Sequence, residues 1–217
     1  MPRPSSRDRA RPQGVHASLS GIPWWTTDVG GYGCGRAEPN DSPYMRELIV
    51  RWYQFGLFSP VFRTHGCRNG PSEPDVYPCR PAQGSCGANE VWSYGAEVQT
   101  MLERYVRLRA SRLAPYMRAL AVNVSARGVP TMRPLWWEFP DDADATVGVN
   151  DAYMLGPDLL VAPVTVQGAT SRDVYLPCAD GPGSTRWRSY WNASDVRLCG
   201  RHTVDAPLST IPVFERA

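Results

Sequence analysis

Two short segments of this 217-residue sequence each end in a side chain that could hold a polar ligand. The first, GIPWWTTDVGGYG over residues 21–33, passes from apolar side chains to Asp28 and then to a pair of glycines. The second, VFRTHG over residues 61–66, passes from apolar side chains to His65 and a glycine. Such a run predicts a buried strand that delivers a polar group to its carboxyl end, where α/β barrels build their sites. Taken alone, Asp28 also fits a turn or a helix cap, and a lone histidine is more often structural.

Two stretches between and after these segments carry the periodicity of amphipathic helices. Residues 43–60 place apolar side chains at three- and four-residue spacing, with Ser42 as the expected N-cap and Gly56 as the expected end. Residues 90–128 carry a second stripe of this kind, which Gly128 should end. Pro115 should kink or divide the second helix, because proline lacks the amide hydrogen of the helix ladder.

The pattern changes in the last third of the chain. Residues 129–140, VPTMRPLWWEFP, predict another strand that ends with an acid. After Tyr153 come short apolar strands, such as DVYLP and TIPVFER, separated by Gly, Pro and Ser. This spacing is typical of a β-sandwich. The sequence therefore predicts a strand–helix alternation followed by an all-β part, with a boundary near residue 140.

Charge and hydropathy exclude several classes of protein. The net charge of +2 is too balanced to indicate a nucleic acid or an anionic membrane as the main partner. No stretch of about 20 apolar residues predicts a transmembrane helix. Residues 1–12 are polar and Arg-rich, which predicts disorder and does not match a secretory signal. The cellular compartment stays open.

The six cysteines do not indicate a metal site, because no pair has the C-x-x-C spacing. Cys178 and Cys199 could form a disulfide in an oxidising compartment, as could Cys67 with Cys79 or Cys86. Residues 67–89 hold three of the cysteines and are rich in Pro, Gly and Ser. They predict a long surface loop or insertion.

Seven blocks in order make the sequence similar to a known family. They are GIPWWTTDVGGYG, RELIVRWYQFGLFSPVFRTHG, EVWSYG, YVRLRASRLAPYM, GVPTMRPLWWEFP, DAYMLGPDLLVAPVTVQGATSRDVYLP and APLSTIPVFER. They resemble glycoside hydrolase family 31, the α-glucosidases and α-xylosidases. The resemblance implies the fold class α/β plus all-β. Residues 13–140 would be the C-terminal portion of a (β/α)8 TIM barrel, with residues 67–89 as an insertion, and residues 141–217 a proximal β-sandwich.

The resemblance also implies the sugar-binding half of an active site. Asp28 matches a carboxylate at the floor of the subsite for the cleaved sugar, and Tyr32 matches an aromatic residue, usually Phe, that lines it. His65 matches a histidine that hydrogen-bonds a sugar hydroxyl, and a neutral imidazole can both donate and accept. Arg63 and Trp25 are expected to support the site, Arg63 through a charge-assisted bond to a carboxylate. The expected ligand is an α-linked oligosaccharide or glycoside, bound without a cofactor.

No catalytic residue is expected within the sequence. Retaining cleavage needs a nucleophile and an acid/base about 5 Å apart, and the family segments that carry them have no match here. We therefore expect a fragment that does not hydrolyse glycosides alone, with the N-terminal barrel half supplied by a longer chain or a partner chain. The alternatives are a non-catalytic pseudoenzyme and a carbohydrate-binding β-sandwich module. Arg133 and Glu138 are expected to form an ion pair rather than to act as catalysts.

Overall fold

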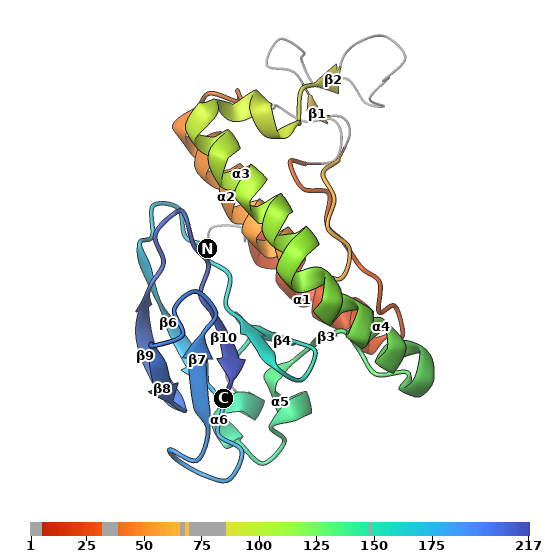
Figure 1. The fold of residues 1–217 in the computed structure, drawn as a ribbon, viewed down its shortest axis with the longest axis vertical. Coiled ribbons are helices and arrows are strands. Elements are labelled where there is room, and N and C mark those ends of the chain that lie inside the picture. Colours follow the sequence, from red (N-terminus) through yellow and green to blue (C-terminus); the bar gives the residue numbers. More distant parts are fainter. Residues whose placement is uncertain (1–5, 32–38, 66–67, 70–85, 148) are drawn as a thin grey trace.

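The helices and the sheets occupy two halves of the molecule (Figure 1). The computed structural model describes residues 6–31, 39–65, 68–69, 86–147 and 149–217. The helical half holds α1 (Ser6–Leu19), α2 (Pro43–Leu57), α3 (Ala96–Leu108) and α4 (Ala114–Arg127). Helices α2 and α3 lie side by side, and the short strands β1 (Arg68–Asn69) and β2 (Cys86–Gly87) pair antiparallel beyond one end of them.

Helix α2 forms as its sequence predicts. Ser42 Oγ accepts a hydrogen bond from the Met45 amide at 3.1 Å and so satisfies one of the free donors of the first turn. Pro43 occupies the first position, where its missing amide hydrogen costs nothing. The helix passes Gly56, its expected end, by one residue.

The second helical stretch is divided before Pro115, as predicted. A short 3-10 turn, η2 (Val91–Tyr94), comes first, and a π-helical turn, η3 (Arg109–Leu113), separates α3 from α4. Because Pro115 cannot donate to the carbonyl one turn earlier, the regular ladder is broken and the turn before it widens. Gly128 ends α4 in the left-handed conformation, with φ of +64°.

Helix α1 begins inside the stretch for which the composition predicts disorder. The helix already starts at Ser6 in the structure, inside that stretch, and residues 1–5 lie outside the described residues. Arg and Ala are strong helix formers, and a helix that is anchored downstream can extend through a polar stretch. The anchor is Ser18, whose Oγ accepts from the amides of Thr131 at 3.0 Å and Met132 at 3.2 Å.

The β half consists of two antiparallel sheets. The larger has the strand order β3 (Met132–Arg133), β4 (Tyr153–Leu155), β5 (Leu159–Val161), β10 (Val213–Arg216), β7 (Arg186–Ser189) and β8 (Val196–Leu198). The smaller pairs β6 (Ser171–Leu176) with β9 (Gly200–Asp205), and short helices α5 (Leu135–Glu138) and α6 (Ala143–Val147) precede β4. A shared core joins the two sheets, with Trp187 and Phe214 from the larger and Val174 and Val204 from the smaller. This is the predicted β-sandwich.

The segment at residues 129–140 differs from its prediction. The sequence predicts a last strand of the strand–helix alternation, but Met132 pairs with Leu155 and Arg133 with Met154, which places β3 at one edge of the six-stranded sheet. A short apolar strand suits either position, and the neighbour that it meets decides its sheet. The expected ion pair of Arg133 with Glu138 is present, and both side chains are largely buried.

A buried arginine ties the helical half to the β half. Arg51 lies on α2 and is only 5% exposed. Its guanidinium donates at 2.7–3.2 Å to four backbone carbonyls of the β half, those of Ala169, Ala206, Pro207 and Thr210. A planar guanidinium with five N–H donors can serve several carbonyls at once. The two halves are therefore joined by directed hydrogen bonds as well as by apolar packing.

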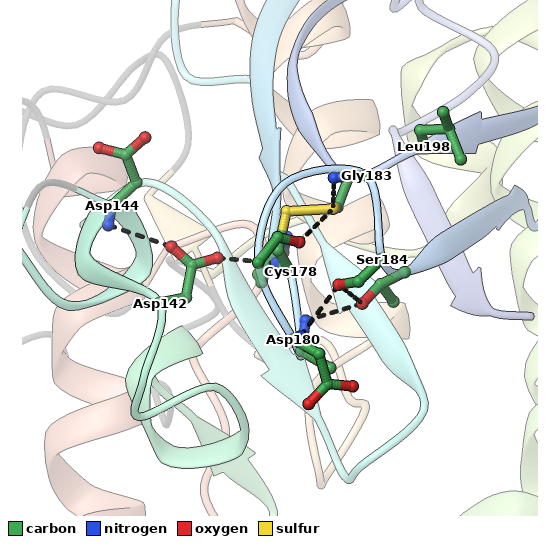
Figure 2. Close-up of a disulfide and its surroundings, with 12 residues drawn as sticks. Asp142, Asp144, Cys178, Asp180, Gly183, Ser184 and Leu198 are labelled. Carbon is green, nitrogen blue, oxygen red and sulfur yellow. Dashed lines mark hydrogen bonds between the residues drawn. A yellow bond between two sulfur atoms is a disulfide. The ribbon is translucent and has the colours of Figure 1, made fainter.

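The predicted disulfide between Cys178 and Cys199 is present (Figure 2). It links the residues that follow β6 to the residue that precedes β9, two positions 21 residues apart. The other predicted disulfide, of Cys67 with Cys79 or Cys86, stays a prediction, because Cys67 and Cys79 lie outside the described residues.

Asp142 lies beside this disulfide and receives several hydrogen bonds (Figure 2). The Cys178 amide donates to it at 2.7 Å, and the Tyr175 hydroxyl donates at 2.7 Å. Partial burial alone would raise the pKa of the Asp142 carboxyl. The bonds from Cys178, Tyr175 and the amides of Ala145 and Asp144 outweigh that effect and hold the pKa below its usual value.

Candidate functional site

The ends of the two predicted strand segments lie against each other. The His65 amide donates to the Val29 carbonyl at 3.0 Å, and the Val61 amide donates to the Trp25 carbonyl at 3.1 Å. A parallel bridge joins the same two segments. Since both run in the same direction, the backbone brings Asp28 and His65 to the same end of the pair.

Neither segment is a regular strand, which differs from the sequence prediction. In the described residues their only strand-type pairing is the single bridge at Val29. Ile22 is 56% exposed and Trp24 is 46% exposed, whereas a buried strand would cover both. A parallel strand needs neighbours along its length, and here the ladder is one pair long. The sequence pattern therefore predicted where each segment turns, but not how its backbone is hydrogen-bonded.

Asp28 is held from the neighbouring segment. The Arg63 guanidinium forms an ion pair with Asp28 Oδ1, and both side chains keep partial contact with solvent. The predicted charge-assisted bond from Arg63 to a carboxylate is therefore present, although that carboxylate is not deeply buried, and the supporting role of Arg63 in a sugar site stays a prediction. Thr27 Oγ1 accepts from Trp52 Nε1 of α2 at 3.2 Å, and the Gly31 amide closes a turn onto the Asp28 carbonyl at 2.8 Å. These contacts fix the backbone on both sides of the carboxylate.

Aromatic contacts hold the two segments on the helical core. Trp25 meets Phe55 of α2 edge-on, with ring centroids 6.1 Å apart. Phe62 meets Tyr53 of the same helix edge-on at 5.4 Å. Trp25 is partly buried against this core, as a supporting residue would be. Tyr32 lies outside the described residues, so its predicted place in the site stays a prediction.

A residue that the sequence reasoning assigned to a loop contacts both segments. Asn89 is 3% exposed, and its side-chain amide donates to the carbonyls of Val29 at 2.9 Å and His65 at 2.7 Å. The Tyr94 hydroxyl donates in turn to Asn89 Oδ1. The one available sequence signal was a polar Asn-Glu pair directly before a helical stretch, which is also typical of an ordinary helix start.

The part of the chain that the structure describes offers no group of three or more His, Cys, Asp or Glu side chains that could hold a metal ion. Among the described helices, none has both the length and the apolarity that crossing a membrane requires.

Two protein-family models match this chain. The model for the glycosyl hydrolases family 31 TIM-barrel domain matches residues 6–120, and the model for the family 31 C-terminal domain matches residues 128–217. The chain belongs to glycosyl hydrolase family 31. The predicted fold class, a portion of the TIM barrel followed by the C-terminal β-sandwich, is confirmed. The C-terminal match begins before β3, in agreement with the place of that strand in the larger sheet.

Family 31 relatives match nearly all of this chain. An α-xylosidase of Saccharolobus solfataricus is 34% identical over 95% of this chain and 24% of its own length. The neutral α-glucosidase C of Mus musculus is 37% identical over 92% of this chain and 19% of its own length. The crystal structure of a family 31 α-xylosidase from a soil metagenome, complexed with xylose, is 39% identical, with a TM-score of 0.78 over 94% of this chain and 29% of that one. This chain thus spans about a quarter of the length of such relatives.

Proposed function

We propose that this chain forms the sugar-binding portion of a family 31 α-glycosidase that acts on α-xylosides or α-glucosides. The observation that carries the proposal is the hydrogen bond of 3.0 Å from the His65 amide to the Val29 carbonyl, which supports a common site for Asp28 and His65. The relatives named α-xylosidase and α-glucosidase, one of them with bound xylose, support the class of ligand.

The side chains of Asp28 and His65, at the same end of the two segments, can form hydrogen bonds with the hydroxyl groups of a pyranose. A carboxylate only accepts hydrogen bonds, whereas a neutral imidazole donates from one ring nitrogen and accepts at the other. Arg63 engages Asp28 Oδ1 and orients the carboxylate, and Asp28 Oδ2 accepts no hydrogen bond from the described residues. In the proposed complex, Oδ2 accepts from one sugar hydroxyl and His65 bonds to a second. Tyr32 lines the same subsite.

The proposal assigns no catalytic residue to this chain. Retaining hydrolysis needs a free carboxylate nucleophile and a second carboxyl as acid/base about 5 Å from it. Asp28 is committed to Arg63, and Glu138 is committed to Arg133. The two bond-breaking carboxyls then belong to another part of the family fold, and we expect the chain alone to show no turnover of aryl α-xylosides or α-glucosides above background. Clear turnover by the purified chain would overturn this part of the proposal.

Binding of xylose and glucose to the chain by itself can be measured by saturation-transfer NMR. We expect weak binding that falls about tenfold in Asp28→Asn and in His65→Gln, since each loses a hydrogen bond to a polar ligand. Equal binding by the wild type and both variants, or no binding by the wild type, would refute the proposal.

Matched controls are available in the β half. Asp195→Asn removes a carboxylate that pairs with Arg197 at 2.9 Å and has a side-chain exposure of 33%, against 32% for Asp28. His202→Gln removes an imidazole whose Nε2 lies 2.7 Å from the Leu198 carbonyl. Both controls should leave sugar binding unchanged.

A further inference from the structure

We propose that Asn89 is a positioning residue for the sugar site, and this inference rests on the proposed function. It ties together the two backbone segments that carry Asp28 and His65, although it touches neither side chain in the described contacts. Its Nδ2 donates to the Val29 carbonyl at 2.9 Å and to the His65 carbonyl at 2.7 Å. One amide group therefore fixes the residue after the carboxylate and the residue that bears the imidazole.

The orientation of this amide is itself fixed. Asn89 Oδ1 accepts from the hydroxyl of Tyr94, which is 1% exposed at the end of η2. The Asn89 backbone amide donates to Glu90 Oε2 at 3.1 Å, and the same carboxylate oxygen accepts from Ser93 Oγ at 3.1 Å. Since the carbonyls of Val29 and His65 can only accept, Asn89 must turn its NH2 group toward them, and Oδ1 is then left to accept from the Tyr94 hydroxyl.

The first segment is shaped to admit this side chain. Gly30 has φ of +93°, and a Cβ at that position would lie 2.1 Å from Asn89 Oδ1. Any other residue would be strained in its backbone and would also displace the Asn89 amide. The glycine in the DVGG turn is thus explained by the close approach of Asn89 as well as by the turn.

The two carbonyls held by Asn89 belong to the segments that the backbone pairs only once along their length. In a long ladder, further hydrogen bonds would set the spacing of Asp28 and His65. Here one parallel bridge and two backbone hydrogen bonds join the two segments. The Asn89 side chain, which binds the end of each segment, therefore contributes strongly to the spacing of Asp28 and His65.

The test compares Asn89→Asp with Gln54→Glu. Both changes keep the size of a buried side chain and replace an NH2 donor by a carboxylate oxygen. Gln54 is 1% exposed and donates to the Leu208 carbonyl at 2.7 Å and the Tyr105 hydroxyl at 2.8 Å, within the helical core and away from the site. Asn89→Asp loses two bonds to carbonyls, whereas Gln54→Glu loses the one to Leu208, because the Tyr105 hydroxyl can donate to the new carboxylate and Arg51 Nη1, 3.2 Å from Gln54 Oε1, can pair with it. Gln54→Glu therefore shows what a carboxylate buried in the core does by itself to sugar binding and to the His65 signals.

We expect Asn89→Asp to weaken xylose and glucose binding about tenfold and to shift the NMR signals of the His65 imidazole, with those of His16 and His202 unchanged. Gln54→Glu should leave sugar binding and the His65 signals unchanged. One milder variant guards against failure of Asn89→Asp to fold. Tyr94→Phe removes the hydrogen bond to Asn89 Oδ1 and should move the His65 signals in the same direction by a smaller amount. Gly30→Ala, which strains the backbone and displaces the amide, should also move them in that direction.

Unchanged His65 signals and unchanged sugar binding in Asn89→Asp and Tyr94→Phe would overturn the inference. Equal losses in Gln54→Glu would also overturn it, because the effect would then follow from general loss of core structure. If the wild type binds neither sugar, the proposed function fails, while the His65 signals still decide whether Asn89 positions this segment.

Discussion

At the scale of single residues, charged side chains in this protein act by holding backbone in place. Asp142 accepts hydrogen bonds from the Cys178 amide, which follows β6, and from the Ala145 amide at the start of α6. Arg63 forms an ion pair with the carboxylate of Asp28. A hydrogen bond to a charged group contributes more than one between neutral groups, so a few such residues fix several turns. The sequence shows these residues as ordinary surface charges, since Arg63 lies 35 positions from Asp28 and Cys178 lies 36 positions from Asp142.

The pH dependence of stability follows from Asp142. Its pKa is lowered in the folded protein, so its stabilising contribution is present above the unfolded carboxyl value of about 3.9 and is lost as the pH falls through the folded value. We expect Asp142→Asn to lower the free energy of unfolding by about 1 kcal/mol at pH 7, discounted for partial exposure. In urea titrations the difference from wild type should shrink as the pH falls through the lowered pKa of the folded protein.

Asp180→Asn is the control, because Asp180 lies in the neighbouring turn and is exposed (Figure 2). It should track the wild type at pH 7 and at low pH. A difference for Asp142→Asn that persists undiminished at low pH would show that ionisation is not its cause.

At the scale of elements, helices α2, α3 and α4 formed as their sequences predict, whereas α1 and the short strands depended on their neighbours. The cap at Ser42, the interruption before Pro115 and the end at Gly128 are local features of chain chemistry. Strand β3 has two residues and no local feature that selects a sheet, so its place beside β4 follows from tertiary contact alone.

The disulfide is a covalent restraint between elements of the β half. It links positions 21 residues apart, and closing a loop of this size restricts the unfolded chain by about 3 kcal/mol. We expect the double variant Cys178→Ala/Cys199→Ala to lose about that much free energy of unfolding in urea titrations. Adding a thiol reductant should destabilise the wild type more than the variant; a variant as stable as the wild type would contradict this account.

At the scale of the whole molecule, the two halves depend on each other through Arg51. Its guanidinium serves four carbonyls of the β half, and each buried carbonyl left without a donor costs about 1–3 kcal/mol. We expect Arg51→Leu to lower the free energy of unfolding by about 3 kcal/mol or more. Arg118→Leu, an exposed arginine on α4, should change it by less than about 0.5 kcal/mol.

Calorimetry of the Arg51→Leu variant tests the coupling directly. If Arg51 joins the halves, its loss should lower the melting temperature and separate one transition into two. A single transition at the temperature of the wild type would show that apolar packing alone joins them.

The sequence by itself determined the structural features that depend on residues within a turn or two of each other along the chain. The helices, their caps, the β-sandwich pattern, the Cys178–Cys199 pair and the turning points at Asp28 and His65 all follow from local periodicity and residue chemistry. Only the tertiary structure decided which distant groups meet: Asn89 with two carbonyls, Arg51 with the loops of the other half, β3 with the C-terminal sheet. A hydrogen bond between residues 24 to 159 positions apart leaves no periodic trace in the chain, because its partners share no face of one helix or strand.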